Sequence, residues 1–237
     1  YSILLLALRR YKEAWAIYDG RLKLDEFKLK NNHIHNTKDK LWLGEKLDNK
    51  MKILVIKEQG VGDEILHASM YPDLLKAFPQ TKIETDPRLI SIFERSFDNV
   101  NSFVPYNTFS KNKKSLKNFD VVMYAGSLGR LFRNNIKNFP KKHFLFSDKN
   151  NDNIIKKNLS RISDKKKIGI SWHSKNVNYG SAKSLHLDMF MPIFVLPEYT
   201  FINLQYGDTK EEIRSFYKTS NINIHNIEEV DLFNDFE

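Results

Sequence analysis

The chain has 237 residues, of which 41% are hydrophobic and 13% aromatic, enough to bury a core in one large domain or two smaller ones. This composition excludes disorder as the main state of the chain. The 38 Lys and Arg residues outnumber the 29 Asp and Glu residues, giving a net charge of +9, and the lack of cysteine excludes a disulfide framework and thiolate chemistry.

The excess of positive charge has two interpretations. A basic protein can bind a polyanion such as nucleic acid or anionic lipid. Here the lysines are spread out and mixed with asparagine, as in residues 111–114 and 149–153, which favours a solvated surface. We therefore expect no nucleic-acid partner. We expect a cytoplasmic location, with the periphery of the inner membrane as an alternative.

The first segment, residues 1–24, is predicted to be a helical hairpin. Ala14, Trp15 and Tyr18 share one face at helical spacing. The apolar run Ile3–Leu8 is far shorter than the roughly 20 residues of a membrane span, so no transmembrane segment is expected. Through Arg10-Tyr11 and Ala14-Trp15 the segment resembles the last unit of a tetratricopeptide repeat array, which implies a protein partner bound by the repeats. The alternative is a plain helical extension packed on the next domain.

Residues 25–50 are polar and are predicted to be a linker with one anchoring aromatic, Trp42. Alternating strands and helices follow, which predicts a parallel sheet in a domain of residues 51–163. The expected strands are 51–57, 82–85, 102–105 and 121–124, and the expected helices are 64–77 and 87–97. Asp86-Pro87 predicts an N-cap followed by proline at the first helical position.

A second α/β domain is predicted over residues 164–237. Its expected strands are 167–172, 200–204 and 222–224, and its expected helices are 187–196 and 210–217. Three strands are too few for a complete doubly wound sheet. The sequence therefore indicates an incomplete second domain, and we expect a fragment truncated at both ends.

Five short motifs occur in an order that resembles the tetratricopeptide-repeat glycosyltransferases, which are similar to the ADP-heptose:lipopolysaccharide heptosyltransferase family. The motifs are Glu58-Gln-Gly-Val-Gly-Asp-Glu-Ile65, Asp86-Pro-Arg-Leu89, Gly126-Ser-Leu-Gly-Arg-Leu-Phe-Arg133, Gly169-Ile-Ser-Trp172 and Asn203-Leu-Gln-Tyr-Gly-Asp208. The resemblance implies the GT-B fold, in which two Rossmann-like domains face each other. It also implies a metal-independent, inverting transfer of sugar from a nucleotide-diphospho-sugar to a hydroxyl of a glycan, lipid or protein, without a cofactor.

Glycosyl transfer needs a base for the acceptor hydroxyl. The resemblance assigns this role to Asp63, whose alternative role is to cap the helix that follows the glycine turn. Glu58 and Glu64 flank Asp63 and are either substitutes for it or solvated. His67, four residues further, either orients Asp63 or packs in the interior. The remaining acceptor-side residues are Glu58, Gln59, Gly60, Gly62 and Arg130, the last aimed at an anionic group or solvated together with Arg133.

The departing diphosphate needs cationic or N–H-rich groups. A strand that ends in small hydroxyl residues, followed by a Gly/Ser loop with a lysine, is typical of such a cradle. The candidate donor-side residues are Ser171, His173, Ser181, Lys183 and Ser184, with Gln205 and Gly207 on the nucleotide side. The alternatives for these positions are an exposed lysine and an ordinary turn between a strand and a helix.

Two other classes of function stay open. A nicotinamide-dependent oxidoreductase would account for Gly60 and Gly62 with an acid about 20 residues further on, such as Glu84, although Ile65 replaces the third glycine. A non-catalytic repeat-containing scaffold or polyanion-binding protein would show a basic stripe instead of a cleft. No metal site is expected, because His33 and His35 lie in the linker without further ligands.

Overall fold

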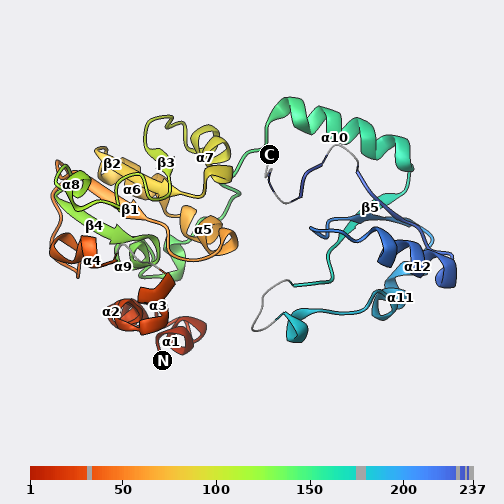
Figure 1. Cartoon of the computed structure of the whole chain (residues 1–237), viewed down its shortest axis with the longest axis horizontal. Helices are drawn as coiled ribbons and strands as arrows, with labels where there is room; N and C mark the ends of the chain where they lie inside the picture. The colour runs from red at the N-terminus through yellow and green to blue at the C-terminus, as the bar shows by residue number, and fades with distance from the viewer. Residues whose placement is uncertain (31–33, 175–179, 228–229, 233, 235–237) are drawn as a thin grey trace. The chain divides into compact units, whose positions relative to one another are not determined.

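The computed structural model describes residues 1–30, 34–174, 180–227, 230–232 and 234 (Figure 1). The chain divides into two compact units, Tyr1–Phe146 and Ser147–Glu237, and each is described by itself. The predicted helical segment and linker both belong to the first unit. Helix α10 (Lys149–Ile162) belongs to the second unit, although its residues were expected within the first α/β domain, 51–163.

In the described part of the first unit, four parallel strands form a sheet in the order β3-β2-β1-β4. These strands are β1 (Ile53–Ile56), β2 (Thr81–Thr85), β3 (Phe103–Pro105) and β4 (Val121–Tyr124). Strand β1 is central and fully buried, which is why it is a continuous apolar run in the sequence. The prediction of a parallel sheet is confirmed, and the strand order is compatible with a Rossmann-like fold.

Helices and short 3₁₀ turns connect these strands and follow the last of them, β4 (Figure 1). They are α5 (Val61–Ala68), α6 (Tyr71–Ala77), η3 (Pro87–Leu89), α7 (Ile90–Phe97), α8 (Lys113–Leu116), η4 (Ala125–Leu128), α9 (Gly129–Phe132) and η5 (Ile136–Asn138). The single helix expected over 64–77 is two helices, because Pro72 near the start of α6 has no N–H to continue the ladder from α5. The Asp86 cap is confirmed, since its carboxylate accepts a hydrogen bond from Arg88 N at 3.1 Å.

The helical segment, residues 1–24, consists of α1 (Ser2–Ala7), α2 (Tyr11–Tyr18) and η1 (Asp19–Lys23), as Figure 1 shows below α9. Its predicted helical character is confirmed. The indole of Trp15 packs on the backbone of Gly129, and Trp15 Nε1 donates to the carbonyl of Arg133 at 2.8 Å. The segment is therefore attached to the loop and helix that follow β4.

Residues 25–30 and 34–50 have more regular structure than the predicted linker. They contain α3 (Asp25–Lys30), α4 (Ile34–Thr37) and η2 (Lys38–Lys40). Phe27 packs edge-to-face on Tyr124, with ring centroids 5.1 Å apart. The predicted anchor Trp42 is buried, and its backbone N donates to Val122 O at 2.8 Å. Two apolar side chains thus hold an otherwise polar segment on the sheet.

In the described part of the second unit, three parallel strands form a sheet in the order β5-β6-β7. The elements are α10, β5 (Lys166–Ile170), η6 (Ser181–Lys183), η7 (Leu187–Phe190), α11 (Met191–Phe194), β6 (Tyr199–Asn203), α12 (Lys210–Ser220) and β7 (Ile224–His225). The helix expected over 187–196 is a 3₁₀ turn followed by the short α11, because Pro192 interrupts the donor series. Phe194, Phe201 and Phe216 form the centre of the core.

Across the residues that the structure describes, no helix combines the length and the apolar character needed to cross a bilayer.

Candidate functional site

The glycine turn after β1 leads directly into α5. Gly60 is the N-cap residue, with an extended backbone (φ −73°, ψ 170°), and its carbonyl accepts from Glu64 N at 3.0 Å. Asp63 is therefore the third residue of the helix, and the alternative that it caps the helix is wrong. Its side chain is exposed, and Gly62 beside it has open space where a Cβ would project. The turn thus presents a carboxylate and bare backbone to solvent.

Gln59 is the immediate neighbour of the Asp63 carboxylate. In the amide orientation that satisfies its surroundings, the Gln59 side-chain nitrogen lies 3.3 Å from both carboxylate oxygens of Asp63. An amide donor stabilises the charged carboxylate and limits its rotation. Gln59 and Asp63 thus act together at this turn.

Glu58 and Glu64 are neither solvated nor available as substitute bases. Glu58 accepts two hydrogen bonds from the Arg21 guanidinium, at 2.7 Å each, and a third from the backbone N of Gly126. Glu64 is 1% exposed and accepts from the Thr85 hydroxyl. A buried carboxylate is retained only when paired in this way, so these two glutamates have structural roles.

Glu64 belongs to a second charged group on the β2 side of the turn. Glu64 Oε2 lies 3.1 Å from Lys57 Nζ, and Glu64 Oε1 accepts a hydrogen bond from Asp86 N at 2.9 Å. Lys57 Nζ also lies 3.5 Å from Asp86 Oδ2. The hydrogen bonds from Arg88 hold the pKa of Asp86 well below its usual range, although burial of the carboxylate acts in the opposite direction. The start of α5 is thus connected to the end of β2 by ionised groups.

His67 is 9% exposed and lies on the buried side of α5, as expected of a histidine that packs in the protein interior. Burial lowers the pKa of its imidazole, although the charges of Glu58 and Asp63 oppose this shift. Among the described residues, His67 makes no hydrogen bond to Asp63. It is therefore a packing histidine, not an orienting group for a base.

Glu84, the acid that the oxidoreductase alternative requires, is fully buried in β2. It accepts from Asn107 N at 3.2 Å, from Phe109 N at 2.5 Å and from the Ser110 N and Oγ at 2.8 and 2.5 Å. All of these donors come from the loop after β3. Glu84 is thus engaged in shaping that loop and is not presented to a ribose.

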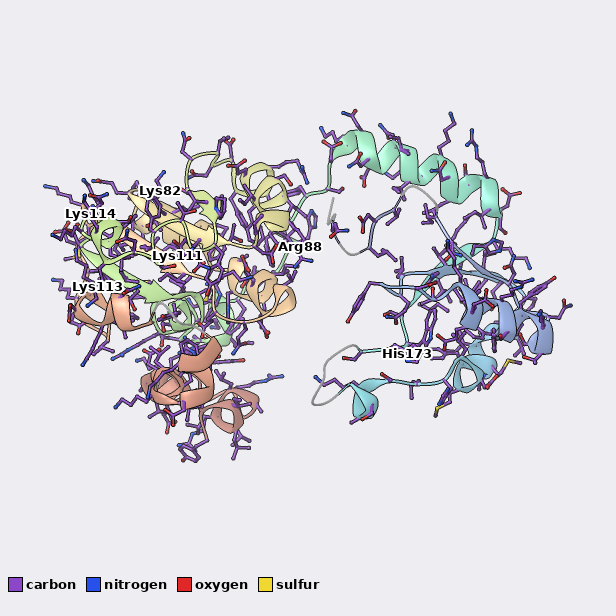
Figure 2. The ribbon with its side chains drawn as sticks, in the orientation of Figure 1. Lys82, Arg88, Lys111, Lys113, Lys114 and His173 are labelled. Atoms are coloured by element: carbon purple, nitrogen blue, oxygen red, sulfur yellow. The ribbon has the colours of Figure 1, made fainter. Side chains whose placement is uncertain are left out.

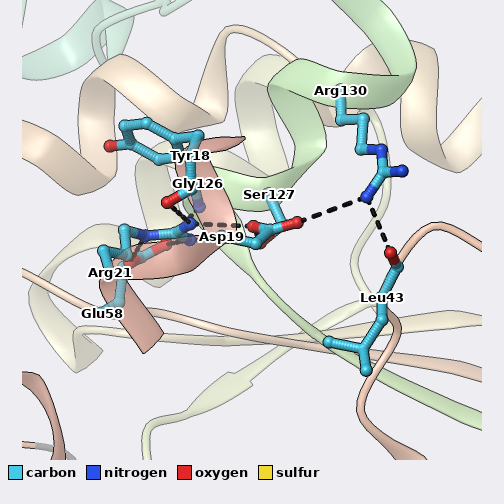
Figure 3. Close-up of polar contacts among 8 residues, drawn as sticks. All are labelled: Tyr18, Asp19, Arg21, Leu43, Glu58, Gly126, Ser127 and Arg130. Carbon is cyan, nitrogen blue, oxygen red and sulfur yellow. Dashed lines mark hydrogen bonds and ion pairs between the residues drawn. The ribbon is translucent and has the colours of Figure 1, made fainter. Parts of the chain in front are cut away.

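The turn η4 and helix α9, which follow β4, contact the helical segment and Leu43 (Figure 3). Ser127 Oγ donates to Asp19 Oδ1 at 2.6 Å and accepts from Arg21 Nη2 at 3.1 Å. Arg130 Nη1 donates to Leu43 O at 2.7 Å and lies 3.8 Å from Asp19 Oδ2. Its guanidinium is already occupied by protein groups, so we reassign Arg130 from the acceptor side to the attachment of these segments.

Arg133 is not solvated either. It is 4% exposed, and its Nη1 lies 2.7 Å from Asp73 Oδ2. Its Nη2 donates to Ser69 O at 2.6 Å. Arg133 therefore joins α9 to the junction between α5 and α6.

In the second unit, Gln205 organises the loop that follows β5. The residue is 2% exposed, and its Oε1 accepts from Ser171 Oγ at 3.0 Å, from Trp172 N at 2.9 Å and from His173 N at 2.7 Å. The carboxyl ends of β5 and β6 are adjacent, so one amide spans them. Gln205 thus positions the predicted donor loop instead of reaching outward.

His173 and Glu212 form a polar pair at this edge of the sheet, and Figure 2 labels His173 in the second unit. His173 Nε2 lies 3.0 Å from Glu212 Oε1, which also accepts from Trp172 Nε1 at 2.9 Å. The His173 side chain is 38% exposed. An imidazole held by a carboxylate in this way is oriented for proton exchange or anion contact on its other nitrogen.

The remaining donor-side residues divide into one that closes the loop and two that are exposed. Ser184 Oγ accepts from Ser174 N at 3.0 Å and donates to Gly180 O at 2.6 Å. Ser181 and Lys183 are exposed, and the Lys183 ammonium has no partner in the part of the chain that the structure describes. Residues 175–179, including the start of the predicted Gly/Ser loop, lie outside the described residues.

An open pocket of about 910 Å³ lies at the carboxyl ends of β6 and β7, beside the start of α12. Its lining residues are Asn203, Leu204, Gln205, Tyr206, Gly207, Asp208, Thr209, Lys210, Asn226, Ile227, Val230, Asp231 and Leu232. Gly207 has a φ of +95°, a conformation that favours glycine. The two residues predicted on the nucleotide side, Gln205 and Gly207, are thus both in the wall of a pocket.

Several residues of these sites were not predicted. Arg21 and Asp19 act through partners far away in the sequence, and no local pattern marks them. The role of Asn203 could have been predicted, because a polar residue at the end of a buried strand needs hydrogen-bond partners. Its Nδ2 donates to Asn226 Oδ1 at 2.8 Å and to Thr209 Oγ1 at 3.0 Å. Within the described residues, no group of three or more His, Asp or Glu side chains is arranged to hold a metal ion.

The chain is similar to Protein FlbA of Caulobacter vibrioides, with 28% identity over 250 aligned residues. The alignment covers all of this chain and 41% of FlbA, so the chain spans about two fifths of the length of that relative. No family model matches the chain. No solved structure matches it either.

Proposed function

We propose that the chain is part of an inverting glycosyltransferase of the GT-B kind, which moves a sugar from a nucleotide-diphospho-sugar to an acceptor hydroxyl. The observation that carries the proposal is the pocket at the carboxyl ends of β6 and β7. Ligands of parallel α/β sheets bind at this end of the strands. The order of the five motifs described above supports the same conclusion.

The chemistry of the pocket wall suits the nucleoside part of such a donor. The exposed Asn226 brings an amide, and Asp208 brings a carboxylate that can accept hydrogen bonds from ribose hydroxyls. The wall has two carboxylates, Asp208 and Asp231, against one lysine, Lys210, and this excess of negative charge disfavours the diphosphate in the same place. In the proposal, the diphosphate is bound by groups outside this pocket, the exposed Lys183 among them.

In the first unit, Asp63 is the proposed base. As the oxygen of the acceptor attacks the anomeric carbon, the bond from that carbon to the diphosphate oxygen breaks, and the hydroxyl proton passes to the Asp63 carboxylate. The nucleoside diphosphate leaves with the electron pair of the broken bond. The exposure of Asp63 and the open space at Gly62 support this role, because an acceptor can approach the turn closely.

Calorimetry with a nucleoside and with its diphosphate tests the donor side. We expect the diphosphate to bind more tightly than the nucleoside, and Lys183→Ala to remove most of that difference while leaving nucleoside binding unchanged. The matched control is Lys218→Ala, an exposed lysine in the last turn of α12. Equal binding of both ligands by the unmodified protein would contradict the proposal.

Turnover with nucleotide-sugars tests Asp63. Removing a general base typically costs a factor of 10²–10⁴ in rate. We expect Asp63→Asn to lower kcat by about that factor, with an unchanged circular dichroism spectrum. Unchanged kcat would remove Asp63 from the mechanism.

One observation favours the polyanion-binding alternative. Figure 2 labels Lys82, Lys111, Lys113 and Lys114 in the first unit. Lys113 and Lys114 begin helix α8. A groove of about 450 Å³ is lined by Lys52 and Lys82 and by Asn118 and Phe119, which follow α8. Binding to heparin that weakens steeply as salt increases, and that is lost in a triple alanine variant of Lys111, Lys113 and Lys114, would support this second function.

A further inference from the structure

The turn that carries Asp63 is fixed from two sides. Strand β1 lies between β2 and β4 in the sheet. Lys57, the first residue after β1, contacts Glu64 and Asp86 on the β2 side. Glu58, the second residue, contacts the backbone N of Gly126 on the β4 side. Two successive residues of the turn, Lys57 and Glu58, are thus held by groups on opposite sides of β1.

The β4 side depends on the helical segment. Glu58 has no exposed side-chain surface, and Arg21, which is 12% exposed, contacts both of its oxygens at 2.7 Å (Figure 3). Arg21 is itself held by Asp19, at 2.9 Å, and by the face of Tyr18, at 4.3 Å from the ring centroid. A buried carboxylate without its cation must turn toward water or take up a proton. The position of Glu58 therefore depends on Arg21.

Asp63 has no such fixation of its own. Its side chain is exposed, and among the described residues its hydrogen-bonding neighbour is the amide of Gln59. Glu58 lies two residues before Gly60, the N-cap residue of α5, and five before Asp63. The direction in which the Asp63 carboxylate points is therefore set by the backbone between Glu58 and α5.

We propose that Arg21 is a positioning residue for Asp63, acting through Glu58, so that the helical segment of residues 1–24 is an integral part of the acceptor side. The role of Asp63 in this inference rests on the proposed function. The effect of Arg21 on the order of the turn does not. The two are tested by separate measurements.

Hydrogen exchange of the amides of residues 58–63 measures the order of the turn. We expect exchange there to accelerate at least tenfold in Arg21→Met, and less in Arg21→Lys, which keeps the charge but loses the two-point contact. The matched control is Arg10→Met in the same helical segment, because Arg10 pairs with Glu13 at the surface. Unchanged exchange in Arg21→Met, or the same change in Arg10→Met, would overturn the inference.

Kinetics then separate positioning from general loss of structure. We expect kcat to fall about tenfold in Arg21→Lys, with an unchanged KM for the donor. Ser127→Ala removes one contact of Arg21 but keeps its ion pair with Glu58, so we expect a smaller decrease in kcat. A rise in donor KM without a change in kcat would overturn the positioning role. If exchange accelerates as expected but the unmodified protein transfers no sugar, the link from Arg21 to the turn holds and the proposed function fails.

Discussion

The indole ring of Trp15 occupies the space that a side chain on Gly129 would need. A Cβ built at Gly129 would lie 2.5 Å from Trp15 Cη2, closer than carbon atoms approach in proteins. The helical segment therefore packs directly on the backbone of α9. This close contact exists because the motif Gly126–Arg133 has glycine at its fourth position.

We expect Gly129→Ala to destabilise the protein by about 1–3 kcal/mol, the usual cost of forcing extra atoms into a packed contact. The φ of Gly129 is −55°, so alanine suits the backbone and the cost reports the contact with Trp15 alone. Urea unfolding measures it. The control is Gly20→Ala, where a Cβ meets nothing within 4 Å. Equal effects of the two substitutions would contradict this account of the contact.

The ion pair of Arg21 with Glu58 gives a second prediction. Arg21→Ala leaves a buried carboxylate without its cation, so we expect a loss of about 3–5 kcal/mol in the free energy of unfolding. Adding Glu58→Gln removes the unpaired charge, and the double variant is expected to be more stable than Arg21→Ala alone. Arg10→Ala, at an exposed pair, should leave the unfolding midpoint unchanged. Additive effects of Arg21→Ala and Glu58→Gln would mean that the two side chains are not coupled.

The fold could be predicted from the sequence wherever local patterns decide it. Strand β4 was predicted at Val121–Tyr124, the range that the structure shows, because a short apolar run there follows Asp120 and ends before Ala125-Gly126. Pro72 and Pro192 were visible signals of helix breaks that the periodicity of the apolar residues concealed. In each case the missing N–H outweighs the apolar pattern.

The polar network could not be predicted in the same way. Glu58 was expected to be a substitute base or solvated, because its neighbours in sequence are polar and glycine-rich. Its partner Arg21 is 37 residues away, and Gly126 is 68 residues away. Only the packing of the helical segment beside the loop after β4 brings these groups together, and no spacing within the sequence encodes that pairing.

The burial of His67 predicts a pH dependence of stability. Burial lowers the pKa of its imidazole in the folded protein, whereas the unfolded chain has the ordinary value of about 6.5. The unfolded state therefore binds more protons as the pH falls below about 6.5. The stability that neutral His67 contributes is complete above that pH and is lost as the pH falls through the folded pKa.

We therefore expect the difference in unfolding free energy between the unmodified protein and His67→Gln to change in favour of the variant between pH 7.5 and pH 5. Glutamine keeps a polar side chain but does not titrate in this range. Urea unfolding at the two pH values measures the difference. A difference that stays constant would mean that the folded protein accommodates the imidazolium as well as water does.

Gly62 separates the stability of the turn from its proposed function. It lies in the first turn of α5, and a Cβ there meets nothing within 4 Å. Gly62→Ala is therefore expected to stabilise the protein by about 0.4–1 kcal/mol, because alanine restricts the unfolded chain. If an acceptor approaches the bare backbone beside Asp63, the same methyl group obstructs it, and we expect the KM for the acceptor to rise. Thermal unfolding and acceptor titrations measure the two effects. A more stable variant with an unchanged acceptor KM would place the acceptor elsewhere, whereas a less stable variant would show that the helix needs glycine at this position for its own geometry.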